Sequence, residues 1–219
     1  MVLFAALGVW QIHRLGWKLA LIDRVNSRIH SPVLPAPGPA DWNTLTRENA
    51  EYRRVQVGGV FQHDKETLVQ AVTDYGAGFW VMTPLRADWG TVLVNRGFVA
   101  ADRKTPRSRR GGQLQGRVSV QGLLRFTDPG GGFLRKNAPG QDRWYSRDLA
   151  AIARARGLGS VAPYFIDAGP DPVAGGWPKG GLTVVRFRNA HLIYALTWFG
   201  LALLSAFGAT IVFRRRGAA

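Results

Sequence analysis

The sequence predicts an α+β membrane protein in which two transmembrane helices flank an extracytoplasmic antiparallel β-barrel-like domain that carries one short helix. Two apolar runs stand near the ends of the 219-residue chain. Between them the hydrophobic pattern changes to a period of two, which is typical of half-buried strands. Turn residues separate these short segments at near-even spacing, which favours a closed sheet.

The second apolar run gives the clearest transmembrane prediction. Leu192 to Phe213 contains no charged residue and no histidine. As a helix it is about 33 Å long, against a hydrocarbon core of roughly 30 Å. A buried soluble helix is the alternative, but such helices rarely lack a polar face. We expect a transmembrane helix over 190–213 and a basic cytoplasmic tail over 214–219, because arginine clusters mark the cytoplasmic side.

The first apolar run is shorter. Met1 to Ile12 is apolar apart from Gln11, but it makes only about 18 Å of helix. Residues 1–22 are therefore expected to form a first transmembrane helix that is truncated or only partly spans, followed by an amphipathic extension. A cleaved signal peptide is the other alternative, although no basic segment precedes the run and no Ala-x-Ala site follows it.

Two spans of opposite direction make a multi-pass protein with both termini cytoplasmic and the middle of the chain outside. Residues 31–40 contain four prolines, which predict a stiff, extended linker. Residues 41–188 are then a periplasmic β-rich domain. No Arg- and Ser-rich presequence is visible, and this favours a bacterial inner membrane over an organelle.

Within the domain, alternation and turn signals predict the strands. Val55 and Val57 share one face, and Gly58-Gly59 predicts a β-bulge. The expected strands cover 53–61, 67–72, 79–85, 91–99, 118–124, 163–167 and, last, 182–187.

One helix is expected to interrupt the strands. Ser146 is its expected cap, with Asp148 in its first turn, and Gly157 is expected to end it.

Composition excludes several classes of function. The chain has no cysteine, which excludes disulfide scaffolds, thiolate metal sites and covalent haem attachment.

The net charge of the chain is +15, yet the cations are scattered. The densest run, 102–110, is expected to be a solvated or lipid-facing loop. We therefore expect no nucleic-acid partner. No P-loop, HExxH, GxSxG or GxGxxG motif is present, and we expect no enzymatic activity.

One histidine stands where the second span begins. His191, Tyr194, Ala195 and Trp198 occupy positions i, i+3, i+4 and i+7 and so share a helix face. An imidazole with aromatic neighbours at an apolar boundary suits haem iron. The alternative is an interfacial aromatic belt with a histidine at the helix end. His13 is expected at the same boundary, either as a second axial ligand or as a solvated side chain.

Five segments, in order, resemble the Surfeit locus protein family of cytochrome oxidase assembly factors. The resemblance covers residue 8 to about residue 203 and differs from the usual pattern at Phe98 and Ala100. The segments are Gly8-Val9-Trp10-Gln11-Ile12-His13-Arg14 with Lys18, Thr83-Pro84-Leu85, Val92-Leu93-Val94-Asn95-Arg96-Gly97, Trp144-Tyr145-Ser146-Arg147-Asp148, and Asn189 to Phe199.

The resemblance implies an assembly factor for a haem-copper terminal oxidase that assists haem delivery to the catalytic subunit. The implied partners are that subunit or its assembly intermediate, together with membrane lipids. The implied cofactor is haem, with haem a first and haem o or haem b as alternatives, and the family histidine falls on His191. A scaffold that binds an oxidase subunit without haem is the alternative function.

The same resemblance marks two groups of motif residues for a structural role or a partner contact. Trp10, Gln11 and Arg14 match the family's first-helix motif, to which His13 does not belong. Asn95, Arg96 and Gly97 match the motif in the middle of the domain.

Overall fold

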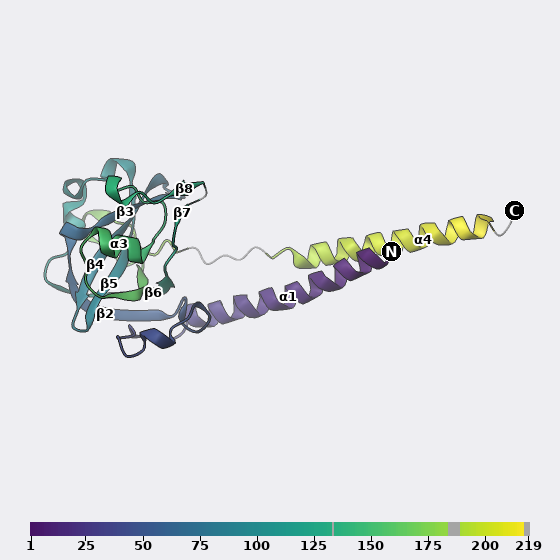
Figure 1. Cartoon of the computed structure of the whole chain (residues 1–219), viewed down its shortest axis with the longest axis horizontal. Coiled ribbons are helices and arrows are strands. Elements are labelled where there is room, and N and C mark those ends of the chain that lie inside the picture. Colours follow the sequence, from purple (N-terminus) through teal and green to yellow (C-terminus); the bar gives the residue numbers. More distant parts are fainter. Residues whose placement is uncertain (133, 184–188, 217–219) are drawn as a thin grey trace. The chain divides into compact units, whose positions relative to one another are not determined.

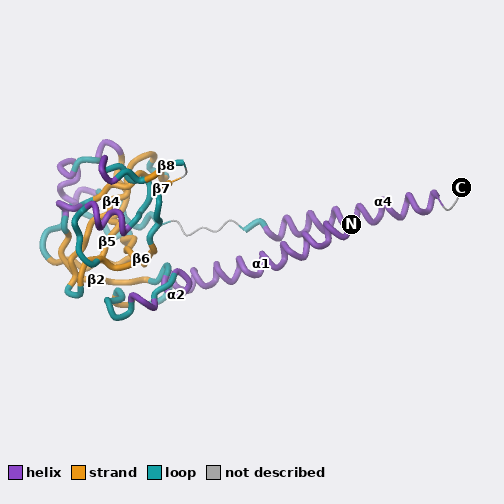
Figure 2. Tube along the Cα trace, in the orientation of Figure 1, coloured by secondary structure: helices purple, strands orange, loops and turns teal. Residues whose placement is uncertain are grey.

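The computed structural model describes residues 1–132, 134–183 and 189–216. The chain divides into two compact units, one made of Met1–Ser27 with Val185–Ala219 and the other of Arg28–Val184. Two long helices make the first unit, and the second is a β-rich domain (Figures 1 and 2).

The domain is built on a seven-stranded sheet in the order β1-β2-β6-β9-β5-β4-β3, which curls so that β2 also pairs with β4. Its strands are β1 (Leu34–Pro35), β2 (Arg54–Phe61), β3 (Thr67–Thr73), β4 (Gly76–Ala87), β5 (Gly90–Ala100), β6 (Arg117–Phe126) and β9 (Val161–Ala168). A separate ribbon joins β7 (Gly131–Gly132) to β8 (Arg135–Lys136). The domain's α-helices are α2 (Arg47–Ala50) and α3 (Leu149–Ala155).

The predicted β-barrel-like sheet is confirmed in outline. Six of the expected strand segments coincide with β2, β3, β4, β5, β6 and β9 to within a few residues. The sheet is not purely antiparallel, because β9 runs parallel to β5 and antiparallel to β6. The expected strand over 182–187 falls mostly on residues outside the described part of the chain.

The expected bulge at Gly58-Gly59 is wrong. The register between β2 and β6 runs through both glycines without a break. Gly59 is needed for a close approach instead, since a Cβ there would lie 2.5 Å from the carbonyl oxygen of Arg86. At this point β2 changes its pairing partner from β6 to β4, and it pairs with β4 through Val60 and Phe61.

A register shift occurs in the next pair of strands. Trp80 of β4 pairs with Phe98 of β5, and Met82 pairs with Asn95. One residue of β4 therefore lies opposite two residues of β5, Arg96 and Gly97, which is a β-bulge. Gly97 has φ +125°, and a Cβ there would lie 2.1 Å from the carbonyl oxygen of Lys179. The motif glycine therefore lets the segment after β9 cross close to the sheet.

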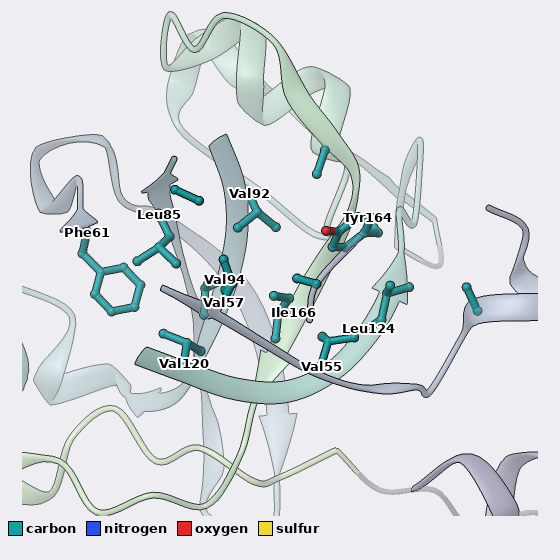
Figure 3. Packing of buried hydrophobic residues seen from close by; sticks show 14 residues of the cluster. Val55, Val57, Phe61, Leu85, Val92, Val94, Val120, Leu124, Tyr164 and Ile166 are labelled. Atoms are coloured by element: carbon teal, nitrogen blue, oxygen red, sulfur yellow. The ribbon is translucent and has the colours of Figure 1, made fainter. Parts of the chain in front are cut away.

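Alternate residues of the curled sheet point into one apolar core (Figure 3). Val55 and Val57 are both buried, as their shared face predicts. The labelled core residues are Val55, Val57, Phe61, Leu85, Val92, Val94, Val120, Leu124, Tyr164 and Ile166. A second cluster packs α3 on the other face of the sheet through Leu149, Ile152, Phe165, Leu93 and Trp144.

The short helix α3 begins two residues later than expected. Its N-cap is Asp148, whose carboxylate accepts a hydrogen bond from the backbone N–H of Ala151 at 3.0 Å. The expected cap, Ser146, instead pairs with the side chain of Asn137. Gly157 follows the helix with φ +58°, which is the usual conformation of a C-terminal glycine.

The proline-rich segment 31–40 is extended and lies on the domain. β1 pairs with β2 in parallel, and the N–H of Ala36 donates to the carbonyl of Gln56 at 2.8 Å. The carbonyl of Pro37 accepts from Tyr164 Oη at 2.6 Å and from Trp42 Nε1 at 3.1 Å. These bonds make the segment part of the domain surface.

The helical unit consists of α1 (Val2–Ile29) and α4 (His191–Arg216), which lie side by side (Figure 1). Among the described residues one helix is long and apolar enough to cross a membrane, over His191–Ile211, with a mean hydropathy of 1.8. A second span over 1–22 is not confirmed, because the apolar run of α1 ends near Ile12 and charged residues follow on the same helix.

Candidate functional site at the helix pair

Two polar side chains meet where α4 begins. The Nδ1 atom of His191 lies 2.7 Å from Oε1 of Gln11 on α1. Gln11 is only 8% exposed, and His191 is half-buried. Within the described residues, Nε2 of His191 has no hydrogen-bond partner. The contact joins the first-helix motif to the motif at the start of the second helix.

Apolar packing fixes the register of the two helices around this contact. Phe4 and Trp198 stack with their ring centroids 5.9 Å apart and their planes 18° apart. Gly8 lies under the ring of Phe199, where a Cβ would come within 2.6 Å of the ring. Ala195 is fully buried one turn after the histidine. Small residues thus allow the close approach that the polar pair needs.

The expected aromatic neighbours of His191 lie in different surroundings. Trp198 is half-buried against α1 through its stack on Phe4. Tyr194 is 55% exposed within the chain. The structure therefore brings His191 and Trp198 to the α1 side, while Tyr194 is mostly exposed among the described residues.

The residues of the first-helix motif also differ in their surroundings, since one faces α4 and the others are exposed. Gln11 faces α4, whereas Trp10 is 53% exposed. Arg14 is exposed, and its guanidinium lies 4.9 Å from the centre of the Trp17 ring. His13 is exposed and lies two residues from Gln11, on another face of α1. The structure therefore does not place His13 opposite His191.

The middle motif lies in the domain and supports its structure. Asn95 Nδ2 donates to Oδ1 of Asp167 at 2.8 Å, and Asp167 is only 3% exposed. Arg125 and Arg147 also donate to this carboxylate, at 3.2 and 3.4 Å, and the hydroxyl of Thr183 does so at 2.9 Å. Four donors satisfy the buried charge. A cavity of about 520 Å³ opens beside the same group.

Arg96 belongs to a separate buried cluster of charges. Its guanidinium lies 3.8 Å from the carboxylate of Glu66, which also forms a bidentate pair with Arg109. Burial, partly offset by Glu66, lowers the pKa of Arg96 to about 10, so it stays charged at neutral pH. Arg109, inside the run expected to be a solvated loop, is only 4% exposed, and that expectation is wrong for this residue.

His63 completes this cluster as a neutral side chain. Its Nε2 lies 2.9 Å from the carbonyl oxygen of Leu114, and its Nδ1 lies 3.4 Å from Nη1 of Arg96. A carbonyl only accepts, so Nε2 carries the proton and Nδ1 accepts from the guanidinium. Burial, and then the charge of Arg96, lower the pKa of His63, against the opposing effect of the Leu114 bond.

Sequence reasoning missed three charged residues that organise the domain. Asp167 is the one charged residue of the otherwise apolar strand β9, and a charge in such a position is a visible signal for a buried network. Glu66 and Arg109 carry no such signal, because each stands in a polar loop segment. No group of three or more His, Asp or Glu residues that suits a metal ion occurs within the described residues.

Together these features define a class of membrane protein in which a curled β-sheet domain is joined to a helix pair with a buried polar contact. The SURF1 family model matches residues 1–203, and the chain belongs to the SURF1 family.

Curated relatives agree with this assignment. The chain is 39% identical to Surfeit locus protein 1 of Homo sapiens, over 92% of this chain and 71% of the human protein. It is 41% identical to Surfeit locus protein 1 of Mus musculus, over 92% and 69%. A SURF1-like protein of Monosiga brevicollis is 37% identical, over 96% and 82%.

Proposed function

We propose that this protein is an assembly factor, without enzymatic activity, for a haem-copper terminal oxidase, and that it holds haem at His191 for delivery to the catalytic subunit. One observation carries the proposal. The imidazole stands at the first residue of the apolar helix, with one ring nitrogen engaged by Gln11 and the other, among the residues that the structure describes, without a hydrogen-bond partner. An ionisable side chain at a membrane boundary marks a functional site.

The residues at this position fit a haem. A neutral imidazole nitrogen is a common axial ligand of haem iron. The neighbouring surface of α4 is apolar and includes the exposed side chains of Leu192 and Tyr194, which suits a large apolar ring. When bound, haem supplies the redox-active iron that the oxidase needs. The chain contributes one ligand and an apolar surface, and a single ligand keeps the group exchangeable.

Family membership supports the proposal that the enzyme being assembled is a haem-copper oxidase. The resemblance of the five motifs implies haem-copper oxidase maturation, with haem a first and haem o or haem b as alternatives. The proposed partner is the catalytic subunit or its assembly intermediate. The proposed location is a bacterial inner membrane. Both termini are proposed to be cytoplasmic and the domain periplasmic, because Arg214 to Arg216 follow the apolar helix.

The test compares two histidines of the same helix pair. Full-length protein is purified from haem-replete membranes as wild type, His191→Ala and His13→Ala, and haem per protein is measured by visible spectroscopy. We expect His191→Ala to lose bound haem and His13→Ala to keep it, because only His191 lies in the α1–α4 contact. Equal haem in wild type and His191→Ala would remove His191 as the ligand.

The alternative function, a scaffold without haem, is separated by a second measurement. Reduced-minus-oxidised spectra are recorded on membranes of the source organism with and without this protein. Selective loss of the oxidase bands, with no haem on the purified wild-type protein, would favour the scaffold. Unchanged oxidase bands and activity would contradict both assembly roles.

A further inference from the structure

The contact between Gln11 and His191 constrains the protonation of the imidazole ring. Oε1 of Gln11 lies 2.7 Å from Nδ1, and a carboxamide oxygen can only accept a hydrogen bond. Nδ1 must therefore carry the proton. In a neutral ring, Nε2 then holds the lone pair.

We infer that Gln11 is a positioning residue that holds His191 in the Nδ1–H tautomer and so presents Nε2 as the nitrogen that binds iron. Histidines that bind metals generally donate their other ring N–H to an acceptor, which fixes the tautomer and the ring orientation. The role toward iron rests on the proposed function. The tautomer does not, because in a neutral ring it follows from the hydrogen bond to the Gln11 carbonyl oxygen.

The helix packing holds Gln11 in place for this task. Gly8, one turn earlier on α1, lies against the ring of Phe199, and Phe4 stacks on Trp198. These contacts set the register of α1 against α4, which brings position 11 level with position 191. Trp10 is adjacent in sequence but 53% exposed, which makes it a matched control.

A neutral amide suits a ligand that must release its cofactor. A carboxylate at position 11 would accept more strongly and make the imidazole more basic, and it would also place a charge beside an apolar helix. An amide oxygen orients the ring without that charge. The expected result is a histidine that is orientated but binds iron less tightly than one paired with a carboxylate.

The tautomer is tested first, without haem. Full-length protein with ¹⁵N-labelled histidine is studied by NMR in detergent micelles, and the His191 signals are assigned by their loss in His191→Ala. We expect the Nδ1–H tautomer in wild type and in Trp10→Leu, and a shift towards Nε2–H in Gln11→Leu. An Nε2–H ring in wild type, or no change in Gln11→Leu, would overturn the inference.

The role toward iron is tested next by titrating haem into the same apo proteins. We expect Gln11→Leu to weaken haem binding about 10- to 100-fold, which is typical when a hydrogen-bond partner of a metal ligand is lost. We expect Gln11→Glu to bind haem at least as tightly as wild type and to raise the iron–histidine stretching frequency of the ferrous protein, since a carboxylate accepts more strongly. A merely structural role would not raise that frequency.

The outcomes separate the two proposals. If His191→Ala binds haem as tightly as wild type, His191 is not the ligand, and both the proposed haem site and the role of Gln11 toward iron are overturned. If His191→Ala loses haem while Gln11→Leu keeps wild-type affinity and stretching frequency, only the role of Gln11 is overturned.

Discussion

At the scale of single residues, the domain contains a buried cluster in which one carboxylate contacts two guanidiniums. Glu66 and Arg109 have side chains that are 6% and 1% exposed, and Arg96 lies beside them at 4%. Backbone carbonyls of Arg103, Lys104 and Gly112 accept further hydrogen bonds from the two guanidiniums. Such a cluster is stable only while every charge keeps its partner.

Glu66→Gln tests this dependence. Glu66 is the carboxylate that both buried arginines contact. Removing its charge leaves theirs uncompensated, and we expect the free energy of unfolding to fall by about 3–5 kcal/mol. Urea unfolding of the detergent-solubilised protein, followed by near-ultraviolet circular dichroism, measures the change.

An exposed ion pair of the same domain supplies the control. Asp88 and Arg117 form a bidentate pair at 2.7 and 2.9 Å, but both side chains are mostly exposed. Asp88→Asn should therefore leave the unfolding curve nearly unchanged, because solvent screens such pairs. Equal losses in the two variants would show that burial does not decide the effect.

At the scale of elements, α1 comes close to α4 at Gly8. Gly8→Val should push the helices apart, since its Cβ would meet the Phe199 ring at 2.6 Å, whereas Gly16 has open space around it. The chain has no cysteine, so cysteines introduced at Phe4 and Trp198 would be the only thiols. A short bismaleimide should cross-link this pair in the Gly16→Val background and much less in the Gly8→Val background. Equal yields would contradict the packing.

Sequence patterns predicted elements better than they predicted contacts between elements. Alternation placed six strands because each strand buries one face, and the i, i+3 and i+7 spacing placed His191 and Trp198 on one side of α4. The partner switch at Gly59 was missed, because a bulge and a close approach both call for glycine. The contact between Gln11 and His191 was also missed, since nothing local to α1 reveals what faces it.

At the scale of the whole molecule, the apolar helix His191–Ile211 and membership of the SURF1 family together indicate a membrane protein. The basic residues after it predict an orientation, and the absence of cysteine makes that orientation measurable. Arg107→Cys, at an exposed domain position, and Gly217→Cys, in the basic tail, are compared in intact spheroplasts. A membrane-impermeant maleimide should label position 107 at once and position 217 only after lysis. The reverse pattern would invert the proposed topology.

The place of β9 in the sheet also sets the order in which the domain can be completed. β9 lies between β6 and β5, yet it is the last of the described strands that the ribosome makes. Until residue 168 has emerged, β1-β2-β6 and β5-β4-β3 meet only through the short pairing of β2 with β4. The edges of β5 and β6 that face each other have unpaired backbone groups during that time, and such edges can pair with the wrong strand. A nascent chain that has emerged up to a point between residues 126 and 161 therefore carries two unpaired strand edges rather than a smaller folded domain.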